Sequence, residues 1–303
     1  MSWLAAAAVV LALGLDALVA EPPRRLHPVA WYGRLVAPLD RAWPRPRLVG
    51  VLAVLLALGA AGVVGGAVAL AGRLHPLVAL AAATLALFST TSHRMLLAEA
   101  RAIVDLSDAD PEAARDRLPA LVGRDPSTLS PAEMRSAAVE SAAENLADGL
   151  VAPLVAFALG AAVSLPVAAG GAAFVKAVNT NDSMLGYRSK PVGWASARLD
   201  DLVMAVPARV SAGLLAVAAL APTTVTRAKA WARTPPSPNS GWPMATVAAA
   251  VDRRLDKPGV YTLNPDAPLP DHAAADHGVT LVARAGLLAF LLAALFSGVV
   301  GWS

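Results

Sequence analysis

The sequence predicts an all-α polytopic membrane protein, and three observations support this fold class. The 303 residues are 56% hydrophobic and only 16% charged, with a mean hydropathy of +0.56, which is well above that of a typical soluble domain. Several uncharged stretches are long enough to cross a hydrocarbon core of about 30 Å as helices. Alternating β-branched residues are rare, so few strands are expected. We therefore predict a single integral-membrane domain over residues 1–303.

The charge balance and the cysteine count exclude several functional classes. The formal net charge of +3 comes from 25 Lys+Arg against 22 Asp+Glu, so nucleic acid is not an expected partner. The chain has no cysteine, which excludes disulfides, thiolate metal sites and a cysteine nucleophile. Its five histidines are scattered without metal-ligand spacing, so a zinc site is not expected.

Four stretches are predicted to span the bilayer. The first is apolar except for Asp16 and lacks the basic start of a signal peptide. The second and third are expected to form a hairpin through Arg73. The four predicted spans are residues 1–20, 48–72, 74–92 and 285–303. Between the last two lies the predicted functional region, residues 93–280.

Two weaker apolar segments decide the topology. Residues 150–175 are interrupted by prolines and glycines, and residues 203–221 carry Pro207 and Arg209 near their middle. We interpret both as broken or re-entrant segments, which places every long polar stretch on one side of the membrane. The alternative is that both are true spans. The loop over residues 21–47 carries six arginines, so this side is expected to face the cytoplasm.

Three carboxylates recur at helical spacing in the string ESAAENLADG. A capping box at Ser130 with Glu133 predicts a helix that starts there and runs to Gly149. On this helix the carboxylates fall every fourth residue and share one face, with an asparagine beside them. Magnesium is the expected complement of such a face, although a solvated helix surface remains the alternative. These residues are Glu140, Glu144, Asp148 and Asn145.

A second string, KAVNTNDSMLGYR, supplies both cations and polar side chains. Lys176, Asn179 and either Asp182 or Ser183 recur at three-to-four-residue spacing, and Tyr187 and Arg188 follow. A lysine can hold phosphate as a point charge and an arginine as a bidentate clamp. For Lys176 alone, a side chain that snorkels from an apolar helix is the simpler alternative.

A third polar element, residues 194–201, places Arg198 beside Asp200 and Asp201. Two interpretations are open: these residues belong to a reaction site, or they form only an internal salt bridge. The chain contains no Walker A motif and no kinase signature, so nucleotide use cannot be inferred from motifs of that kind.

Taken in order, these strings closely resemble the CobD/CbiB family, the adenosylcobinamide-phosphate synthases of cobalamin biosynthesis. The resemblance covers most of the chain. It is carried by Asp16 with Glu21-Pro22-Pro23 and His27-Pro28-Val29, by Val122-Gly123-Arg124-Asp125, by residues 138–149, by residues 176–188, by Gly193-Trp194-Ala195 with residues 197–201, and by Ser237-Pro238-Asn239 with Gly241-Trp242-Pro243. The chain departs from the family pattern at Ala20-Glu21, where Gly-Asp is usual, at Asn181, which replaces an apolar residue, and over residues 253–265.

The resemblance implies an ATP-dependent ligase that joins adenosylcobyric acid to an aminopropanol phosphate through an amide bond. On this basis we expect Mg²⁺ and ATP as cofactor and co-substrate. The catalytic candidates are Lys176, Asp182, Asp200 and Asp201, and the magnesium candidates are Glu140, Glu144 and Asp148. The substrate- or phosphate-binding candidates are Arg124, Asn145, Asn179, Ser183, Tyr187, Arg188, Trp194, Arg198 and Asn239.

Two other functional classes compete with the ligase. Broken apolar segments flanked by charges also build the binding sites of small-solute transporters. A non-catalytic protein that organises other corrinoid-pathway enzymes at the membrane is the third possibility. Such an organiser would tolerate loss of Glu144 or Lys176, whereas a ligase would lose turnover.

Overall fold

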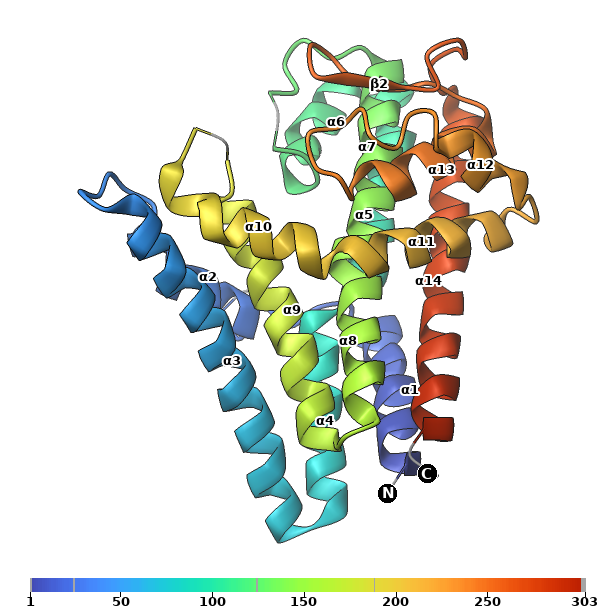
Figure 1. Ribbon diagram of the computed structural model, residues 1–303. Helices are drawn as coiled ribbons and strands as arrows, with labels where there is room; N and C mark the ends of the chain where they lie inside the picture. The colour runs from blue at the N-terminus through green and yellow to red at the C-terminus, as the bar shows by residue number, and fades with distance from the viewer. Residues whose placement is uncertain (1, 24, 124, 188, 301–303) are drawn as a thin grey trace. The chain divides into compact units, whose positions relative to one another are not determined.

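The computed structural model describes residues 2–23, 25–123, 125–187 and 189–300, and is helical almost throughout. Figure 1 shows the order of its elements. The α-helices are α1 (Ser2–Val19), α2 (Pro28–Val36), α3 (Pro46–Leu74), α4 (Pro76–Thr90), α5 (Arg94–Ala109), α6 (Pro111–Arg117), α7 (Pro131–Leu146), α8 (Ala152–Ala161), α9 (Leu165–Leu185), α10 (Trp194–Val203), α11 (Ala205–Ala218), α12 (Thr223–Ala228), α13 (Gly241–Val251) and α14 (His272–Val300). The predicted all-α fold class is confirmed.

The remaining elements are short. Turns of 3₁₀-helix lie at Ala37–Leu39, Leu118–Ala120 and Pro191–Gly193, and a π-helical turn lies at Ala147–Val151. The strands β1 (Leu255–Lys257) and β2 (Tyr261–Leu263) pair antiparallel, with Asp256 opposite Thr262. This small hairpin is the only sheet in the described part of the chain.

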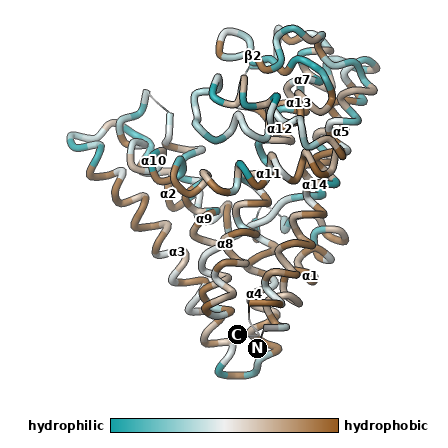
Figure 2. Tube along the Cα trace, turned by 45° about the vertical axis from the view of Figure 1, so that its right-hand side comes forward, coloured by the Kyte–Doolittle hydropathy of each residue, from teal (hydrophilic) through white to brown (hydrophobic). Residues whose placement is uncertain are grey.

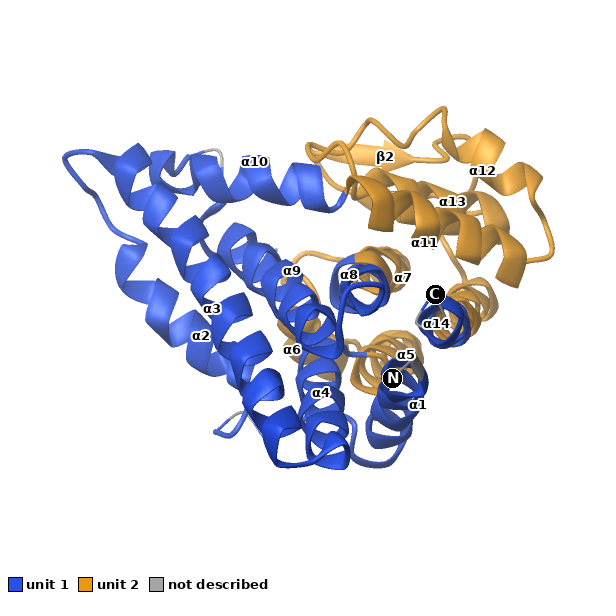
Figure 3. Cartoon of the chain, turned by 60° about the horizontal axis from the view of Figure 1, so that its bottom comes forward, with its two compact units in different colours: residues 1–92, 148–204, 289–303 blue, residues 93–147, 205–288 orange. Residues whose placement is uncertain are grey.

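The chain divides into two units, which Figure 3 shows in different colours. Unit 1 contains residues 1–92, 148–204 and 289–303, and unit 2 contains residues 93–147 and 205–288. Each unit is therefore assembled from segments that are distant in the sequence. The two units are described separately below.

Four helical stretches among the described residues are long and apolar enough to cross a membrane, so this is a membrane protein. They are Pro46–Leu74, Pro76–Ala109, Pro131–Ala161 and His272–Val300. Figure 2 shows how predominantly hydrophobic α3 is along its length. The first, second and fourth contain the predicted spans 48–72, most of 74–92 and most of 285–303. The predicted first span, 1–20, forms the shorter apolar helix α1.

The helix that starts at Pro131 does not end at Gly149, so that prediction is wrong. Its capping box is present, because Ser130 accepts from the Glu133 backbone while the Glu133 carboxylate accepts from the Ser130 N–H at 2.8 Å. Gly149 lies inside the π-helical turn, which inserts an extra residue without stopping the helical path. The stretch continues as α8 to Ala161 and becomes a candidate span.

In unit 1, α9 packs against more helices than any other element. It contacts α3 and α8 most extensively, and also α4, α10 and α2. The chain turns back at residues 162–164, where the Ser164 hydroxyl accepts from the Val167 N–H at 3.3 Å and caps α9. The segment 150–175 is therefore folded back on itself, as the interrupted apolar pattern predicted. A second hairpin joins α3 to α4 and breaks at His75, two residues beyond the predicted Arg73.

Small residues allow α3 and α9 to approach closely. A Cβ on Gly170 would lie 2.9 Å from the Ala61 carbonyl oxygen, and one on Gly65 would lie 3.0 Å from that of Pro166. Neither space holds a methyl group without backbone movement. The neighbouring Gly62 and Gly66 face open space, so only Gly65 among the α3 glycines is required by this contact.

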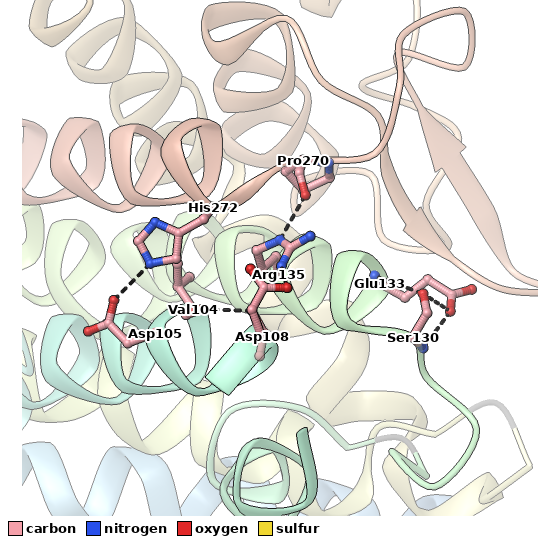
Figure 4. A network of polar contacts seen from close by, with 9 residues as sticks. Val104, Asp105, Asp108, Ser130, Glu133, Arg135, Pro270 and His272 are labelled. Atoms are coloured by element: carbon pink, nitrogen blue, oxygen red, sulfur yellow. Dashed lines mark hydrogen bonds and ion pairs between the residues drawn. The ribbon is translucent and has the colours of Figure 1, made fainter. Parts of the chain in front are cut away.

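In unit 2, α7 and α13 pack together and each contacts further elements, α5 and β1 against α7, α11 and α12 against α13. Figure 4 shows the polar network that ties α7 to its neighbours. The buried Arg135 donates to the Pro270 carbonyl at 2.9 Å, the Ser107 hydroxyl at 3.0 Å and the Asp108 carboxylate at 2.6 Å. A buried guanidinium is tolerated here because several of its N–H groups have partners.

The glycine contact between α3 and α9 yields a stability prediction. We expect Gly170→Ala to lower the free energy of unfolding by about 1–3 kcal/mol, the usual cost of overpacking a tight contact. Thermal unfolding of the detergent-purified protein measures this. Gly62→Ala is the matched control, since it places the same methyl group in open space and should be neutral or slightly stabilising. Equal effects of the two substitutions would contradict the close α3–α9 approach.

Candidate active site

The charged side chains of unit 1 gather around Lys176 on α9. Its ammonium lies in the field of the Glu21 carboxylate, from the segment between α1 and α2, and of the Asp148 carboxylate, from the π-helical turn. Asp200 from α10 in turn acts on Asp148. We call this group the Lys176 cluster; it contains Glu21, His27, Asp148, Lys176, Asn179, Asp182, Asp200 and Asp201.

The α8–α9 hairpin brings two of the sequence strings together. Asn179 follows Lys176 by one turn and donates through Nδ2 to Asp148 Oδ2 at 3.1 Å. Because α8 and α9 run in opposite directions, the start of α8 and the end of α9 lie at the same end of the hairpin. The carboxylate of the ESAAENLADG string and the lysine of the KAVNTNDSMLGYR string therefore share one site, as the fold-back interpretation required.

Glu21 is the anionic partner that the sequence analysis did not assign. Its side chain is only 18% exposed, and burial alone would raise its pKa. Hydrogen bonds from His27 and Ser92, together with the charges of His27 and Lys176, outweigh burial and hold the pKa of Glu21 below its ordinary value. His27 Nε2 lies 3.5 Å from Glu21 Oε2. Glu21 is therefore ionised at neutral pH and balances the lysine.

His27 also has a structural role that explains its position. Its Nδ1 accepts from the Val29 N–H at 3.2 Å and caps α2, which leaves Nε2 to face Glu21. Glu21 and His27 both lie in the N-terminal block of the family resemblance, which was the available signal for them. Ser92, at the end of α4, carries no such signal in the sequence.

Asp182 lies one turn before the end of α9, outside the four candidate spans. Burial, and then the nearby charge of Asp201, raise the pKa of Asp182 to about 6. A carboxyl group with this pKa takes up and releases a proton near neutral pH, which suits an acid–base role.

The charge balance of the Lys176 cluster favours a cation. Five carboxylates stand against one lysine and one histidine, and carboxylate oxygens are the ligands that Mg²⁺ prefers. No group of three or more acidic or histidine side chains is placed to hold a metal ion in the described ranges. Magnesium needs only one or two protein carboxylates when a substrate phosphate supplies further oxygens, so the residues fit this mode of binding.

The predicted magnesium set is divided by the structure. Glu140 is buried and Glu144 half-buried in α7 of unit 2, whereas Asp148 lies in unit 1. The π-helical turn also interrupts the four-residue repeat, since its hydrogen bonds close from i to i+5. Asp148 is the member of this set that belongs to the Lys176 cluster, and the three-residue set stays a prediction.

A buried amide supports the cluster from the other side of α9. Asn181 is 1% exposed, accepts from the Tyr32 hydroxyl at 2.9 Å and donates to the Ala53 carbonyl at 2.8 Å. It thereby ties α9 to α2 and α3. The departure from the family's apolar residue at this position is accommodated because both polar groups of the amide are hydrogen-bonded.

The remaining candidates of unit 1 are exposed at its surface. Arg198 and Ser183 are exposed, and the Ser183 hydroxyl donates to the Asn179 carbonyl at 2.9 Å. The Tyr187 ring lies 4.9 Å from Lys190 Nζ, and the Trp194 ring 5.8 Å from the Arg47 guanidinium.

Two candidates belong to unit 2 and two lie outside the described residues. Asn145 donates to the Ser141 carbonyl at 3.0 Å, and Asn239 accepts from Arg209 at 2.5 Å. Arg124 and Arg188 fall outside the residues that the structure describes.

Unit 1 is therefore a helical membrane bundle with an ionisable site built from separate segments, a class of protein expected to bind or transform a charged solute. Comparison with known proteins identifies the family. The model of the CobD/CbiB family, described as CobD/Cbib protein, matches residues 9–289. This chain belongs to the CobD/CbiB family.

Curated relatives match over nearly the whole chain. A probable cobalamin biosynthesis protein CobD of Methanothrix thermoacetophila is 38% identical, and the match covers 95% of both chains. A cobalamin biosynthesis protein CobD of Rhodobacter capsulatus is 38% identical over 92% of this chain and 93% of its own. One of Mycobacterium tuberculosis is 41% identical over 86% and 83%, respectively. No solved structure matches the chain.

The lowered pKa of Glu21 predicts how stability depends on pH. A carboxyl group with a depressed pKa in the folded state stabilises the protein above its unfolded pKa, here about 4.5, and this contribution is lost as the pH falls through the folded-state value. Glu21→Gln should therefore be less stable than the wild type near neutral pH, and the difference should shrink as the pH falls below about 4.5. Thermal unfolding of both proteins, measured at intervals from about pH 3 to about pH 7, gives this difference in stability.

Asp116→Asn is the control for this experiment, because it neutralises an exposed carboxylate in unit 2. A stability difference between Glu21→Gln and wild type that stays constant over the acid range would contradict the ionised Glu21.

Proposed function

We propose that this protein acts in cobalamin biosynthesis as an amide-forming ligase, joining adenosylcobyric acid to an aminopropanol phosphate with consumption of ATP. The family membership and the curated relatives, which are named cobalamin biosynthesis proteins, support the pathway. The specific reaction is the one that the sequence resemblance implies.

One observation carries the proposal. Four separate sequence blocks of the resemblance contribute to the Lys176 cluster: Glu21 and His27 from the first, Asp148 from the ESAAENLADG string, Lys176 to Asp182 from the next, and Asp200 with Asp201 from the fourth. Segments far apart in the sequence are thus used to build one group of ionisable side chains. A purely structural role does not require such a group beside apolar helices, where charged side chains are costly.

The reaction needs charges of the kinds found here. The substrate carboxylate attacks the terminal phosphorus of ATP, which forms an acyl phosphate and releases ADP. The amine of the aminopropanol phosphate then attacks the acyl carbon, loses a proton, and displaces inorganic phosphate. Negative charge develops on phosphate and acyl oxygens, whereas the incoming amine arrives as a cation.

In this proposal each part of the cluster has a task. Lys176 neutralises phosphate or acyl oxygens, and the carboxylates attract the ammonium group of the second substrate. Asp182, whose pKa is raised to about 6 by burial and by the nearby Asp201, accepts the proton that the amine loses. Asn179 orients Asp148 through their hydrogen bond.

Magnesium would be held by Asp148 and Asp200, with substrate phosphates completing its ligands. When bound, it would neutralise charge on the transferred phosphoryl group. Arg198 is exposed, and in this proposal it contacts the phosphate of an incoming substrate. Arg124 and Arg188 stay candidate phosphate ligands, and Asn145 and Asn239 candidate substrate contacts, on the strength of the sequence resemblance.

We also propose that the Lys176 cluster faces the cytoplasm of the cell membrane. The segments of residues 21–47 that flank the cluster carry the excess of arginines that the positive-inside rule assigns to that side. ATP and a soluble aminopropanol phosphate would reach the site from there. Cysteine labelling at Ser189 in this cysteine-free chain tests the orientation, and labelling from outside only would overturn it.

The ligase assay is the central test. Purified protein in detergent is incubated with adenosylcobyric acid, aminopropanol phosphate and Mg-ATP, and the corrinoid is analysed by mass spectrometry. We expect a new amide with the wild type and a loss of turnover by about 10²- to 10³-fold in Lys176→Met and Asp200→Asn, typical for removal of an electrostatic group from a reaction site. Asp116→Asn is the charge-matched control and should keep wild-type turnover.

A wild-type protein that forms no amide with all components present would refute the ligase. Full turnover in both cluster variants, with unfolding temperatures equal to wild type, would instead show that the chemistry lies elsewhere in the chain. The protein is also reconstituted into lipid vesicles. A ligase still forms the amide there without moving any substrate across the vesicle membrane, whereas a transporter moves the substrate and forms no amide.

Removal of the metal provides an independent check. Chelation with EDTA should abolish amide formation, and Mg²⁺ should restore it. Asp148→Asn should raise the Mg²⁺ concentration needed for half-maximal rate, because one of the two proposed carboxylate ligands is lost. An unchanged magnesium dependence in Asp148→Asn would remove that residue from the metal site.

A further inference from the structure

Unit 1 contains a second polar feature, where α3 begins. A cavity of about 430 Å³ is lined by residues 40–43 with Pro46, and by residues 189–192. We call it the α3 entry cavity. None of the residues of the Lys176 cluster lines it.

Two cations line the α3 entry cavity. The Arg41 guanidinium is exposed and lies 4.0 Å from the centroid of the Trp43 ring. The indole N–H of Trp43 donates to the Leu39 carbonyl at 3.0 Å, so the ring that supports Arg41 is itself fixed. Lys190 Nζ lies 2.8 Å from Asp40 Oδ2 and contacts the Met184 carbonyl at 3.3 Å. The cavity thus presents a planar guanidinium on an aromatic platform beside an ammonium group.

The chain segments that line the cavity are rich in basic residues. Residues 28–47 contain four arginines and a single acid, Asp40, and residues 189–194 add Lys190. In the lining of the cavity itself, Arg41 and Lys190 stand against one carboxylate, Asp40, whereas carboxylates predominate in the Lys176 cluster. A ligand that matches this cavity is an anion, and the fork of Arg41 suits the oxygens of a phosphate.

The position of the cavity selects the source of the phosphate. Pro46 lines the cavity and is also the first residue of α3, an apolar candidate span of 29 residues. Directly after it, α3 exposes Leu48, Val51, Leu52 and Leu55, which are between 44% and 63% exposed. Figure 2 shows the hydrophilic entry to α3 and the hydrophobic helix that follows. An anion held in the cavity would thus sit where the phosphate of a lipid lies when its acyl chains run along the helix.

The aromatic side chains near the cavity are also typical of a membrane–water interface. Trp43 lines the cavity, and Trp194 lies beside Arg47 at 5.8 Å from its guanidinium. Tryptophan and tyrosine gather at membrane–water interfaces, where one part of the ring is apolar and the other is hydrated. The start of α3 therefore carries aromatic rings, cations and adjacent exposed leucines together.

We propose that the α3 entry cavity binds the phosphate headgroup of an anionic phospholipid, with Arg41 and Lys190 as its cationic contacts. The acyl chains lie against the exposed leucines of α3. The lipid phosphate contacts both the loop before α3 and the segment before α10, and so holds the two together. This site does not depend on the ligase reaction, because it uses none of the residues assigned to catalysis.

The test uses the full-length protein in a neutral detergent. Binding of phosphatidylglycerol and of phosphatidylcholine with the same acyl chains is measured by native mass spectrometry over a range of lipid concentrations. We expect phosphatidylglycerol to bind more tightly, and Arg41→Gln to weaken its binding by about fivefold, the effect of one basic side chain on an anionic lipid. Lys190→Gln should weaken it to a similar degree.

Arg73→Gln is the matched control, since it removes an exposed arginine from the last turn of the same helix. It should leave phosphatidylglycerol binding at the wild-type level. Both Arg41→Gln and Arg73→Gln alter exposed side chains, and thermal unfolding checks that each variant is folded. A second readout is quenching of tryptophan fluorescence by brominated phosphatidylglycerol, which should decrease in Trp43→Phe.

Three results would overturn the proposal. Equal affinity for the two lipids would show that the headgroup charge is not recognised. Equal losses of phosphatidylglycerol affinity in Arg41→Gln and Arg73→Gln would show that the lipid responds to the net charge of the protein and not to this cavity. Displacement of the lipid by inorganic phosphate at equimolar concentration would assign the cavity to a free phosphate and not to a lipid.

Discussion

The charge of Lys176 is the constraint on which the arrangement of unit 1 depends. An ammonium group among apolar helices is stable only if carboxylates lie beside it, because transfer of an isolated charge out of water is costly. Glu21 and Asp148 supply this compensation from two segments far from α9 in the sequence. The segment after α1 and the start of α8 must therefore both meet α9 at one end. The close α3–α9 contact and the hydrogen-bonded Asn181 keep α9 in the position that this requires.

The π-helical turn allows one helical stretch to be both an apolar candidate span and the source of a site carboxylate. Residues 131–161 form an apolar candidate span, yet Asp148 within it belongs to a polar cluster. A π-helical turn adds one residue to the turn and so shifts the helical phase, and such turns are frequent at functional sites. Pro153 is accommodated in the same stretch because it has no N–H to donate to the Gly149 carbonyl, and this carbonyl accepts from the Ser92 backbone N–H at 2.9 Å instead. The helix thus changes the face it presents without ending.

Unit 1 separates charges of opposite sign. The Lys176 cluster has an excess of carboxylates, which suits a metal ion or an ammonium substrate, whereas the α3 entry cavity has an excess of cations, which suits a phosphate. Aromatic rings and exposed leucines accompany the second feature and are not part of the first. If both proposals hold, this division lets the bundle bind charged, water-soluble substrates at one surface and a lipid headgroup at another.

The sequence by itself determined the fold class, the family and most of the side chains that gather around Lys176, because these depend on local properties: apolar length, capping residues and contiguous polar strings. The helix start at Ser130, the fold-back of residues 150–175 and the joining of Asp148 to the Lys176 string could all be argued from such patterns. Only the tertiary structure decided that Glu21 balances Lys176, that Asn181 is satisfied by Tyr32 and Ala53, and that the helix passes through Gly149. The physical reason is that compensation of a charge or a buried amide depends on which distant segments meet, and helix continuation at a glycine depends on what the following residues pack against.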